Sequence, residues 1–411
     1  MIILAIETSC DDTGIAVLEV HPVKSAKGGA PIKSGQFDWA RKPNFKVLSN
    51  VVSSQIKIHQ QYGGVFPMVA TREHQKNLAP VLIKSLKEAK LLKAKKIINK
   101  IEDNKIKEIF EKEPELYKFT KKLLESYEKP EVDFIAVTYG PGLEPCLWTG
   151  VNFARALSYY WEIPIIPVNH IEAHILVNFM NHKTWNMKQV FPALSLIVSG
   201  GHTQLIFIEN IGKYKIIGET RDDAAGECFD KAAKILGLEY PGGPQITALA
   251  AISQKNAEQT QNNAENSSFV PHKLPRPMMH SKDYDFSFSG LKTAVLYETR
   301  GKKLTKDYIA NVCFEVQQAI IDVLLKKTIQ AAKDYKVKTI ILGGGVSANK
   351  ELRKQFNYSL QTTNYKLNLL VPPVNLSTDN GLMIAVAGYF HRNKTTPWQK
   401  LKANANLRIN R

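Results

Sequence analysis

The stretch MIILAIETSCDDTGIAVLEV (residues 1–20) decides the fold, because it is typical of two apolar β-strands joined by a polar turn, SCDDTG (9–14). The second half repeats this arrangement at 193–209, where the turn is SGGHT (199–203). In each half a third strand follows, and then helical and strand-like segments alternate. The duplicated βββαβα order predicts an α/β protein with an actin-like or sugar-kinase-like fold, in which two lobes flank a central cleft.

This fold predicts a division of the chain into lobes and additions. We expect an N-terminal lobe at 1–169 with insertions at 21–47 and 97–130, a C-terminal lobe at 170–390 with a helical subdomain at about 222–335, and a basic tail at 391–411.

Composition limits the class of protein. With 411 residues and 44% hydrophobic residues the chain has enough apolar material for two folded domains, which excludes general disorder. The four cysteines form no CxxC pair, so neither a disulfide framework nor a cysteine-rich zinc module is expected. The sequence begins with a strand-like segment, without a secretion signal or a run long enough to span a membrane, so we expect a cytoplasmic protein.

The net charge of +17 indicates a polyanionic partner such as a nucleic acid. Nearly all of the excess lies in three stretches, 21–47, 84–129 and 392–411. For 84–129, a pair of solvated amphipathic helices is the favoured alternative to a nucleic-acid-binding arm. The charge distribution predicts that these additions help to hold nucleic-acid phosphates while a nearly neutral core carries the chemistry.

The segment NHIEAH (169–174) indicates a metal site, because His170 and His174 are four residues apart and lie on one face of a helix. Asp379 begins the corresponding helix of the second half, so a pseudo-twofold axis would place it opposite the histidines across the cleft. Two imidazoles and a carboxylate suit Fe(II) and tolerate Zn(II). Helix-terminal histidines bonded to backbone or water, and an N-cap role for Asp379, are the alternatives. Glu172 points about 200° away from His170, unlike the base of an HExxH protease.

Glycine-rich turns indicate a nucleotide site. The turns at 9–14 and 198–204 occupy equivalent places in the two halves, and backbone N–H groups freed at such turns bind phosphates. Asn349, in the turn GGGVSANKELR, is placed to bond a ribose or base, Asp230 to accept bonds from ribose hydroxyls, and Gly243 to leave room for them. The alternatives are structural turns and, for Asp230, a carboxylate in the first turn of a helix.

Seven motifs together resemble one family, the tRNA adenosine threonylcarbamoyltransferases, whose bacterial members are the TsaD proteins once described as glycoproteases. The motifs are IETSCDDTG, HIEAH, VSGGHTQ, DDAAGECFDKAAKILGLEYPGGP, DFSFSGLKT, GGGVSANKELR and STDNG. The resemblance implies an actin-like fold and transfer of the threonylcarbamoyl group from threonylcarbamoyl-AMP to N6 of the adenosine at tRNA position 37, in tRNAs that read codons beginning with adenine. It also implies TsaB-like and TsaE-like helper proteins and one divalent metal per subunit, Fe(II) or Zn(II).

Carried over motif by motif, the resemblance implies roles for single residues. The metal ligands would be His170, His174 and Asp379, the three reached by spacing. The adenylate would contact Ile197, Val198, Ser199, Gly200, Gly201, Asp230, Gly243 and Asn349.

Asp11 is the candidate that positions or deprotonates the attacking amine, with a turn-stabilising aspartate as the alternative. The segment GPGLEPCLWTG departs from the family at Glu144, Pro145 and Trp148, which affects the expected helper surface.

Three other classes of function stay open at this stage. An actin-fold ATPase or small-molecule kinase would use the phosphate-binding turns but not His170 and His174. A nucleotide-dependent scaffold would keep the metal as a structural element, and a metallopeptidase would need Glu172 as its base.

Overall fold

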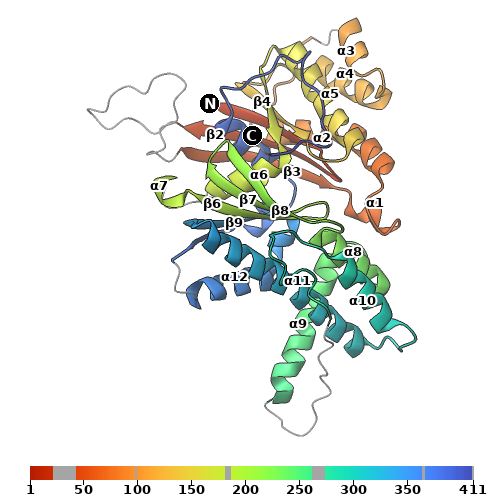
Figure 1. Ribbon diagram of the computed structural model, residues 1–411. Coiled ribbons are helices and arrows are strands. Elements are labelled where there is room, and N and C mark those ends of the chain that lie inside the picture. Colours follow the sequence, from red (N-terminus) through yellow and green to blue (C-terminus); the bar gives the residue numbers. More distant parts are fainter. Residues whose placement is uncertain (22–42, 98–99, 181–186, 262–273, 363–365, 410–411) are drawn as a thin grey trace. The chain divides into compact units, whose positions relative to one another are not determined.

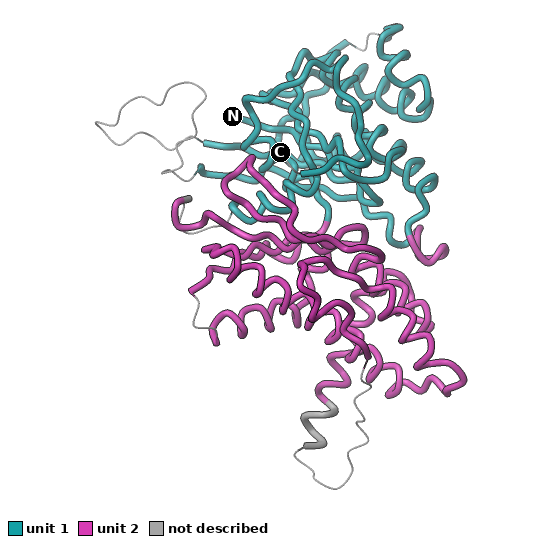
Figure 2. Tube along the Cα trace, viewed as in Figure 1, with its two compact units in different colours: residues 1–57, 65–187, 379–409 teal, residues 58–64, 188–378, 410–411 magenta. Residues whose placement is uncertain are grey.

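The computed structural model describes residues 1–21, 43–97, 100–180, 187–261, 274–362 and 366–409. The chain forms two compact units, shown in Figure 2. Unit 1 comprises 1–57, 65–187 and 379–409, and unit 2 comprises 58–64, 188–378 and 410–411. Most of the predicted insertion at 21–47 lies outside the described residues.

Unit 1 contains a five-stranded sheet in the order β3-β2-β1-β4-β5 (Figure 1). Its strands are β1 (Ile2–Glu7), β2 (Asp12–His21), β3 (Asn44–Ser54), β4 (Phe134–Gly140) and β5 (Ile165–Asn169). The first three strands pair antiparallel, whereas β4 and β5 join in parallel. Ile6 is opposite Ile15 on one side and Val137 on the other, so β1 is central and its side chains are buried on both faces.

Helices cover both faces of this sheet. The helices of unit 1 are α1 (Ile56–Gln60, which straddles the two units), α2 (Pro67–Glu88), α3 (Asn104–Ile109), α4 (Pro114–Ser126), α5 (Glu144–Trp161), α6 (His170–Leu176), a 3₁₀ turn at Val177–Phe179 and α13 (Gly381–Phe390). Of these, α2, α5, α6 and α13 contact the sheet, and α3 and α4 pack on α5 and α2. Leu4 and Ile6 belong to the core shared with α2 and α5. Ile3 and Ala136 lie close to Gly388 of α13. Because side chains of a strand alternate, α13 covers the opposite face from α2 and α5.

The lysine-rich segment at 84–129 supplies α3, α4 and the end of α2. Helix α4 buries Leu116, Leu123 and Leu124, and its lysines face outward. Acidic neighbours pair with part of the positive charge, as Glu108 does with Lys105 at 2.7 Å. This pattern supports the favoured alternative of solvated amphipathic helices.

Unit 2 repeats the sheet of unit 1, in the order β10-β9-β6-β7-β8. The strands are β6 (Ala193–Val198), β7 (Thr203–Asn210), β8 (Lys213–Glu219), β9 (Thr339–Gly343) and β10 (Asn368–Leu370). Three consecutive strands again pair antiparallel, and two later strands join in parallel. The predicted actin-like α/β fold with duplicated βββαβα units is confirmed.

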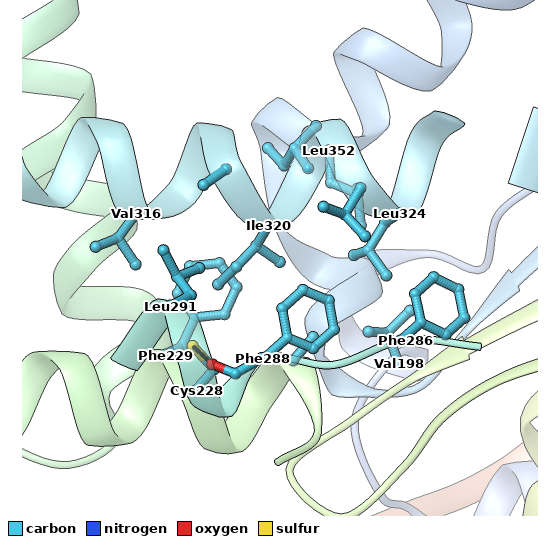
Figure 3. Packing of buried hydrophobic residues seen from close by; sticks show 14 of the residues in the cluster. Val198, Cys228, Phe229, Phe286, Phe288, Leu291, Val316, Ile320, Leu324 and Leu352 are labelled. Carbon is cyan, nitrogen blue, oxygen red and sulfur yellow. Dashed lines mark hydrogen bonds between the residues drawn. The ribbon is translucent and has the colours of Figure 1, made fainter. Parts of the chain in front are cut away.

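The helices of unit 2 form a second core. They are α7 (Met187–Val190, at the junction with unit 1), α8 (Ala225–Ile235), α9 (Gly242–Gln261), α10 (Ser289–Thr299), α11 (Lys306–Asp334) and α12 (Lys350–Thr362), with 3₁₀ turns at Gly345–Ala348 and Val374–Leu376. Figure 3 shows Ile320 and Leu324 of α11 beside the stacked rings of Phe286 and Phe288, whose centroids are 6.3 Å apart. Within the described residues, α11 is the one helix long and apolar enough to cross a membrane, and 61% of its most apolar window is buried. Its place in this core accounts for its apolar composition.

The borders of the units differ from the predicted lobe borders at 169/170 and 390/391. Unit 1 continues to residue 187, and the C-terminal segment 379–409 also belongs to it. The reason is packing, because α13 lies on the unit 1 sheet and Phe390 contacts Phe179 edge to face. The predicted basic tail is likewise packed on unit 1 up to Ile409, which is 4% exposed.

Candidate functional site

The three predicted metal ligands come together within unit 1. Ligand atoms of His170, His174 and Asp379 all lie within 4.8 Å of one another. Asp379 Oδ1 is 3.2 Å from Nε2 of His174 and 3.6 Å from Nε2 of His170. The two imidazole rings are nearly perpendicular, with centroids 4.7 Å apart. Two Nε2 atoms and one carboxylate oxygen therefore converge on a single point.

Helix caps explain how the local sequence presents these groups. The Asn169 side chain accepts hydrogen bonds from the backbone N–H groups of Ile171 and Glu172, which starts α6 at His170. Asn380 caps α13 by accepting a bond from Met383 N at 3.1 Å. The N-cap is thus Asn380 rather than Asp379, and the carboxylate one residue earlier lies beside the histidines.

The route by which Asp379 reaches the histidines differs from the prediction. The pseudo-twofold argument placed it across a cleft in the other lobe, whereas α13 packs on the sheet of unit 1 next to α6. A Cβ atom on Gly14 would lie 2.7 Å from Gly381 N. Glycine at this point lets the start of α13 touch β2, which brings Asp379 close to the β1–β2 turn.

Two groups behind His170 were missed in the sequence. Nδ1 of His170 lies 3.1 Å from Ser9 Oγ and 3.3 Å from Glu7 Oε2. Glu7 is fully buried, and its other oxygen accepts a 2.6 Å bond from Ser9 N. With a metal bound, a proton kept on Nδ1 and directed to Glu7 would leave the Nε2 lone pair available to the metal. The available signal was an acidic residue at the end of the apolar strand IILAIE, where a carboxylate needs a partner.

Carboxylates dominate the electrostatics around His170. Burial by itself disfavours a charged imidazole, but the charges of Asp379 and Glu7 more than offset it and raise the pKa of His170 to about 9. Burial acts to raise the pKa of Glu7, but His170 outweighs it, and the pKa of this carboxyl is lowered. Burial, followed by the charges of Asp11 and Asp379, raises the pKa of Asp12 to about 7. Negative groups thus exceed positive ones around His170.

His174 supports a metal at this place. It is 1% exposed, and among the described residues neither ring nitrogen makes a hydrogen bond, although Asp379 Oδ1 lies 3.2 Å from Nε2. Buried polar atoms without partners are costly, so a ligand at Nε2 is the simplest way to satisfy one of them. Asp379 is 23% exposed, which leaves one side of the group open to a substrate. The donor set and its burial therefore fit a divalent metal.

Glu172 has a different neighbour. Its Oε1 lies 2.8 Å from Nε2 of His391, and both side chains are buried. The pair joins α6 to the end of α13, the two elements next to the metal group. The contact with His391 accounts for the burial of the Glu172 carboxylate. Glu172 therefore needs no role as a base on a metal-bound water to explain its position.

The β1–β2 turn carries Asp11 beside Cys10 and Asp12, two residues on which the charge of Asp379 also acts. Asp11 is half-buried and helps to raise the pKa of both Cys10 and Asp12, in each case after the effect of burial. His74 of α2 holds the turn from behind, with Nδ1 2.8 Å from Thr13 Oγ1 and Nε2 2.9 Å from Cys10 O. Sequence reasoning missed His74, since it lies 61 residues away from Thr13 in the chain.

The predicted nucleotide-binding residues lie together in unit 2. Ile197 and Val198 end β6, and Ser199 opens the turn to β7, where its N–H donates to His202 O at 2.8 Å. A Cβ atom on Gly200 or Gly201 would meet nothing within 4 Å. The backbone of this turn is therefore accessible to a ligand.

Hydrogen bonds within the protein hold the other predicted nucleotide-binding residues, Asp230, Gly243 and Asn349. Asp230 lies within α8 rather than in its first turn, and its Oδ1 accepts a 2.7 Å bond from Gly242 N. Asn349 donates to Thr247 Oγ1 at 3.0 Å, and Thr247 in turn donates to Gly243 O at 2.8 Å. The start of α9 at Gly242–Gly243 is thus fixed from both sides.

Comparisons with known proteins agree with these motifs. The family model TsaD, tRNA N6-adenosine threonylcarbamoyltransferase, matches residues 46–98 and 115–386. Residues 1–45, the gap at 99–114 that contains α3, and the C-terminal tail lie outside the match. A relative of that name from Thermosipho melanesiensis is 40% identical over 95% of this chain and 94% of its own. Another, from Thermosipho africanus, is 39% identical over the full length of both chains.

Solved structures give weaker similarities. A ROK family protein from Streptococcus pneumoniae is 12% identical, with a TM-score of 0.43 over 96% of this chain and 99% of its own. The family match and the full-length relatives carry the assignment instead. The chain therefore belongs to the TsaD family of tRNA N6-adenosine threonylcarbamoyltransferases.

Proposed function

We propose that this chain transfers the threonylcarbamoyl group of threonylcarbamoyl-AMP to N6 of the adenosine at tRNA position 37, in tRNAs that read codons beginning with adenine. The observation that carries the proposal is the convergence of His170 Nε2, His174 Nε2 and Asp379 Oδ1 in a buried site rich in negative charge. Family membership supplies the reaction class.

The site holds one divalent metal, Fe(II) in preference and Zn(II) as an accepted substitute, through His170, His174 and Asp379. When bound, the metal supplies Lewis acidity for the threonylcarbamoyl group. Glu7 and Ser9 keep the His170 ring in one orientation through Nδ1. Hydrogen-bond partners at the other ring nitrogen of a metal-ligating histidine fix its tautomer and raise the basicity of the ligating nitrogen.

The chemical step forms a bond between N6 of adenosine and the carbonyl carbon of the donor, and breaks the bond from that carbon to the AMP phosphate oxygen. Asp11 positions the amine and takes its proton, at the open side of the site. The backbone N–H groups of Gly200 and Gly201 hold the leaving phosphate, next to Ser199. Ile197 and Val198 line this turn, and the adenosine of the donor lies against Asp230, Gly243 and Asn349.

The tRNA is the polyanion that the net charge of +17 indicates. In the tail, Lys394, Lys400, Lys402 and Arg408 are exposed, and residues 392–411 contain no acid. We assign these side chains to tRNA phosphates. A tRNA substrate places the enzyme in the cytoplasm.

TsaB-like and TsaE-like helper proteins act together with this chain in the transfer reaction. The apolar side chains at the start of α2 give unit 1 a surface of the kind that partners cover, since Phe66 is 51% and Met68 56% exposed.

Reconstitution tests the proposal. Purified protein is incubated with threonylcarbamoyl-AMP and tRNA, with and without helpers, and the tRNA nucleosides are analysed. We expect threonylcarbamoyladenosine to form, with about one equivalent of iron or zinc per chain, and His170→Ala to abolish both. Bound metal without any transfer would favour a scaffold, and nucleotide hydrolysis without transfer would favour an ATPase or kinase.

A further inference from the structure

A segment near the C-terminus, Thr396–Leu407, crosses unit 1 in extended and turn conformations. We call it the C-terminal strap. It starts at a β-bridge with β5, where Thr396 N donates to Ile165 O at 2.9 Å. Leu401 is 3% exposed and belongs to the core formed with α2 and α5. The strap is therefore part of the folded unit, although it lies beyond the residues that match the family model.

Trp398 anchors the strap to α5. Arg155 donates from Nε to Trp398 O at 3.0 Å and from Nη1 to Asn152 Oδ1 at 2.8 Å. The indole meets the Tyr159 ring edge to face at 5.2 Å, and Lys105 of α3 lies 5.8 Å from the indole centroid. These contacts come from α5 and from α3, so the anchor ties the strap to two helices of unit 1.

Beyond the anchor the strap contacts the end of β4 and the residues after it, Tyr139–Leu143, which we call the Tyr139–Leu143 loop. Asn404 N donates to Tyr139 O at 2.7 Å, and Gly142 N donates to Ala405 O at 3.3 Å. A Cβ atom on Gly140 would lie 2.0 Å from Asn404 O. The backbones of loop and strap are thus in direct contact, at a place where a side chain does not fit.

The same loop contacts Ser9, the residue whose side chain lies beside Nδ1 of His170. Leu143 N donates to Ser9 O at 2.8 Å. A Cβ atom on Gly142 would lie 2.5 Å from Ser9 O and 2.8 Å from Ser9 Cβ. Ser9 Oγ is 3.1 Å from His170 Nδ1. A continuous series of contacts therefore leads from the strap through the loop and Ser9 to a metal ligand.

We propose that the C-terminal strap is a positioning element of the metal site, which keeps the Tyr139–Leu143 loop against Ser9 and so fixes Ser9 Oγ at Nδ1 of His170. The inference rests on the metal site of the proposed function. Its physical basis is that partners of a ligating histidine set the ring orientation and affinity, and their loss costs about 10–100-fold in metal affinity. The strap adds a requirement for residues more than 200 positions away from His170 in sequence.

The test measures metal affinity directly, by competition between the full-length protein and a chelator for Co²⁺ and Zn²⁺. We expect Trp398→Ala to weaken binding about tenfold and Trp398→Phe, which keeps an aromatic ring against Tyr159, to restore most of it. Gln399→Ala, a change at the exposed neighbour, is the matched control and leaves affinity unchanged. Circular dichroism shows whether each variant is folded, and Arg155→Lys weakens the same anchor more gently if Trp398→Ala does not fold.

A double-mutant cycle with Ser9→Ala decides whether the strap acts through Ser9. If it does, adding Trp398→Ala to Ser9→Ala weakens metal binding no further. Independent, multiplying effects would overturn the inference, as would Trp398→Ala and Arg155→Lys proteins that are folded and bind metal like the wild type. In metal-free protein, the ¹⁵N shift of His170 Nδ1 should move in Trp398→Ala as it does in Ser9→Ala. A wild-type protein that binds no metal would instead overturn the metal site of the proposed function.

Discussion

Glu113 offers a quantitative test of the structure. This carboxylate, at the start of α4, is 5% exposed and accepts a 2.8 Å hydrogen bond from Asn152 Nδ2. Burial raises its pKa to about 7, against the opposing effects of the Asn152 bond and of Arg155. Asn152 also binds Arg155, which anchors the C-terminal strap. The substitution Glu113→Gln keeps an oxygen acceptor for Asn152 and removes the titration.

The expected effect follows from linkage between protonation and folding. Below pH 4.5, the ordinary value, both the folded and the unfolded chain carry the proton. As the pH rises, the unfolded chain loses it first, so stability falls until the folded pKa near 7 is passed. At 1.36 kcal/mol per pKa unit, this loss is about 3 kcal/mol. Glu113→Gln should therefore gain stability relative to wild type by about 3 kcal/mol between pH 4.5 and 8.

Urea unfolding followed by tryptophan fluorescence measures this difference, because Trp148, Trp161 and Trp398 all belong to unit 1. Glu111→Gln, at an exposed carboxylate two residues away, is the matched control for the loss of one negative charge beside α4. A stability difference between Glu113→Gln and wild type that stays constant from pH 4.5 to 8 would refute the reasoning.

Three further predictions concern function. Asp379→Asn should weaken metal binding about 100-fold in calorimetry while the protein stays folded, since it removes the charged ligand; unchanged affinity would contradict this. Lys400→Gln with Lys402→Gln should raise the tRNA KM several-fold and flatten its dependence on salt, with kcat preserved; if neither KM nor its salt slope moves, the tail lysines only solvate the surface. Gly344→Ala should raise the KM for threonylcarbamoyl-AMP about tenfold, because φ is +84° and the new Cβ would lie 2.4 Å from Val198 O, beside the phosphate turn; a wild-type KM would argue against this turn as the donor site.

Local sequence patterns were enough to predict the fold class. Two strands joined by a short polar turn give a pattern of alternating buried and exposed residues, and this pattern is present in both halves. Strands so close together in the chain pair with each other directly. The i, i+4 spacing of His170 and His174 is equally local, since helix geometry alone places them on one face. These parts of the protein depend on residues close together in the chain.

Asp379 shows the limit of that reasoning. The correct residue was predicted, but through a symmetry between lobes, whereas the structure brings it to His170 by packing α13 on the sheet of unit 1. Nothing in the segment STDNG tells which sheet the following apolar helix covers. Glu7 and Ser9 were missed for the same reason, because a role behind His170 appears only when residues 161–163 positions apart meet.

The sequence by itself therefore determined the duplicated α/β architecture, the two histidines and the glycine-rich turns, all of which follow from short-range periodicity and backbone freedom. Only the tertiary structure decided that 379–409 belongs to unit 1, that Glu7 and Ser9 hold His170, and that the basic tail is a packed strap anchored at Trp398. These contacts depend on which surfaces bury one another, and packing of that kind joins residues without leaving a pattern in either segment.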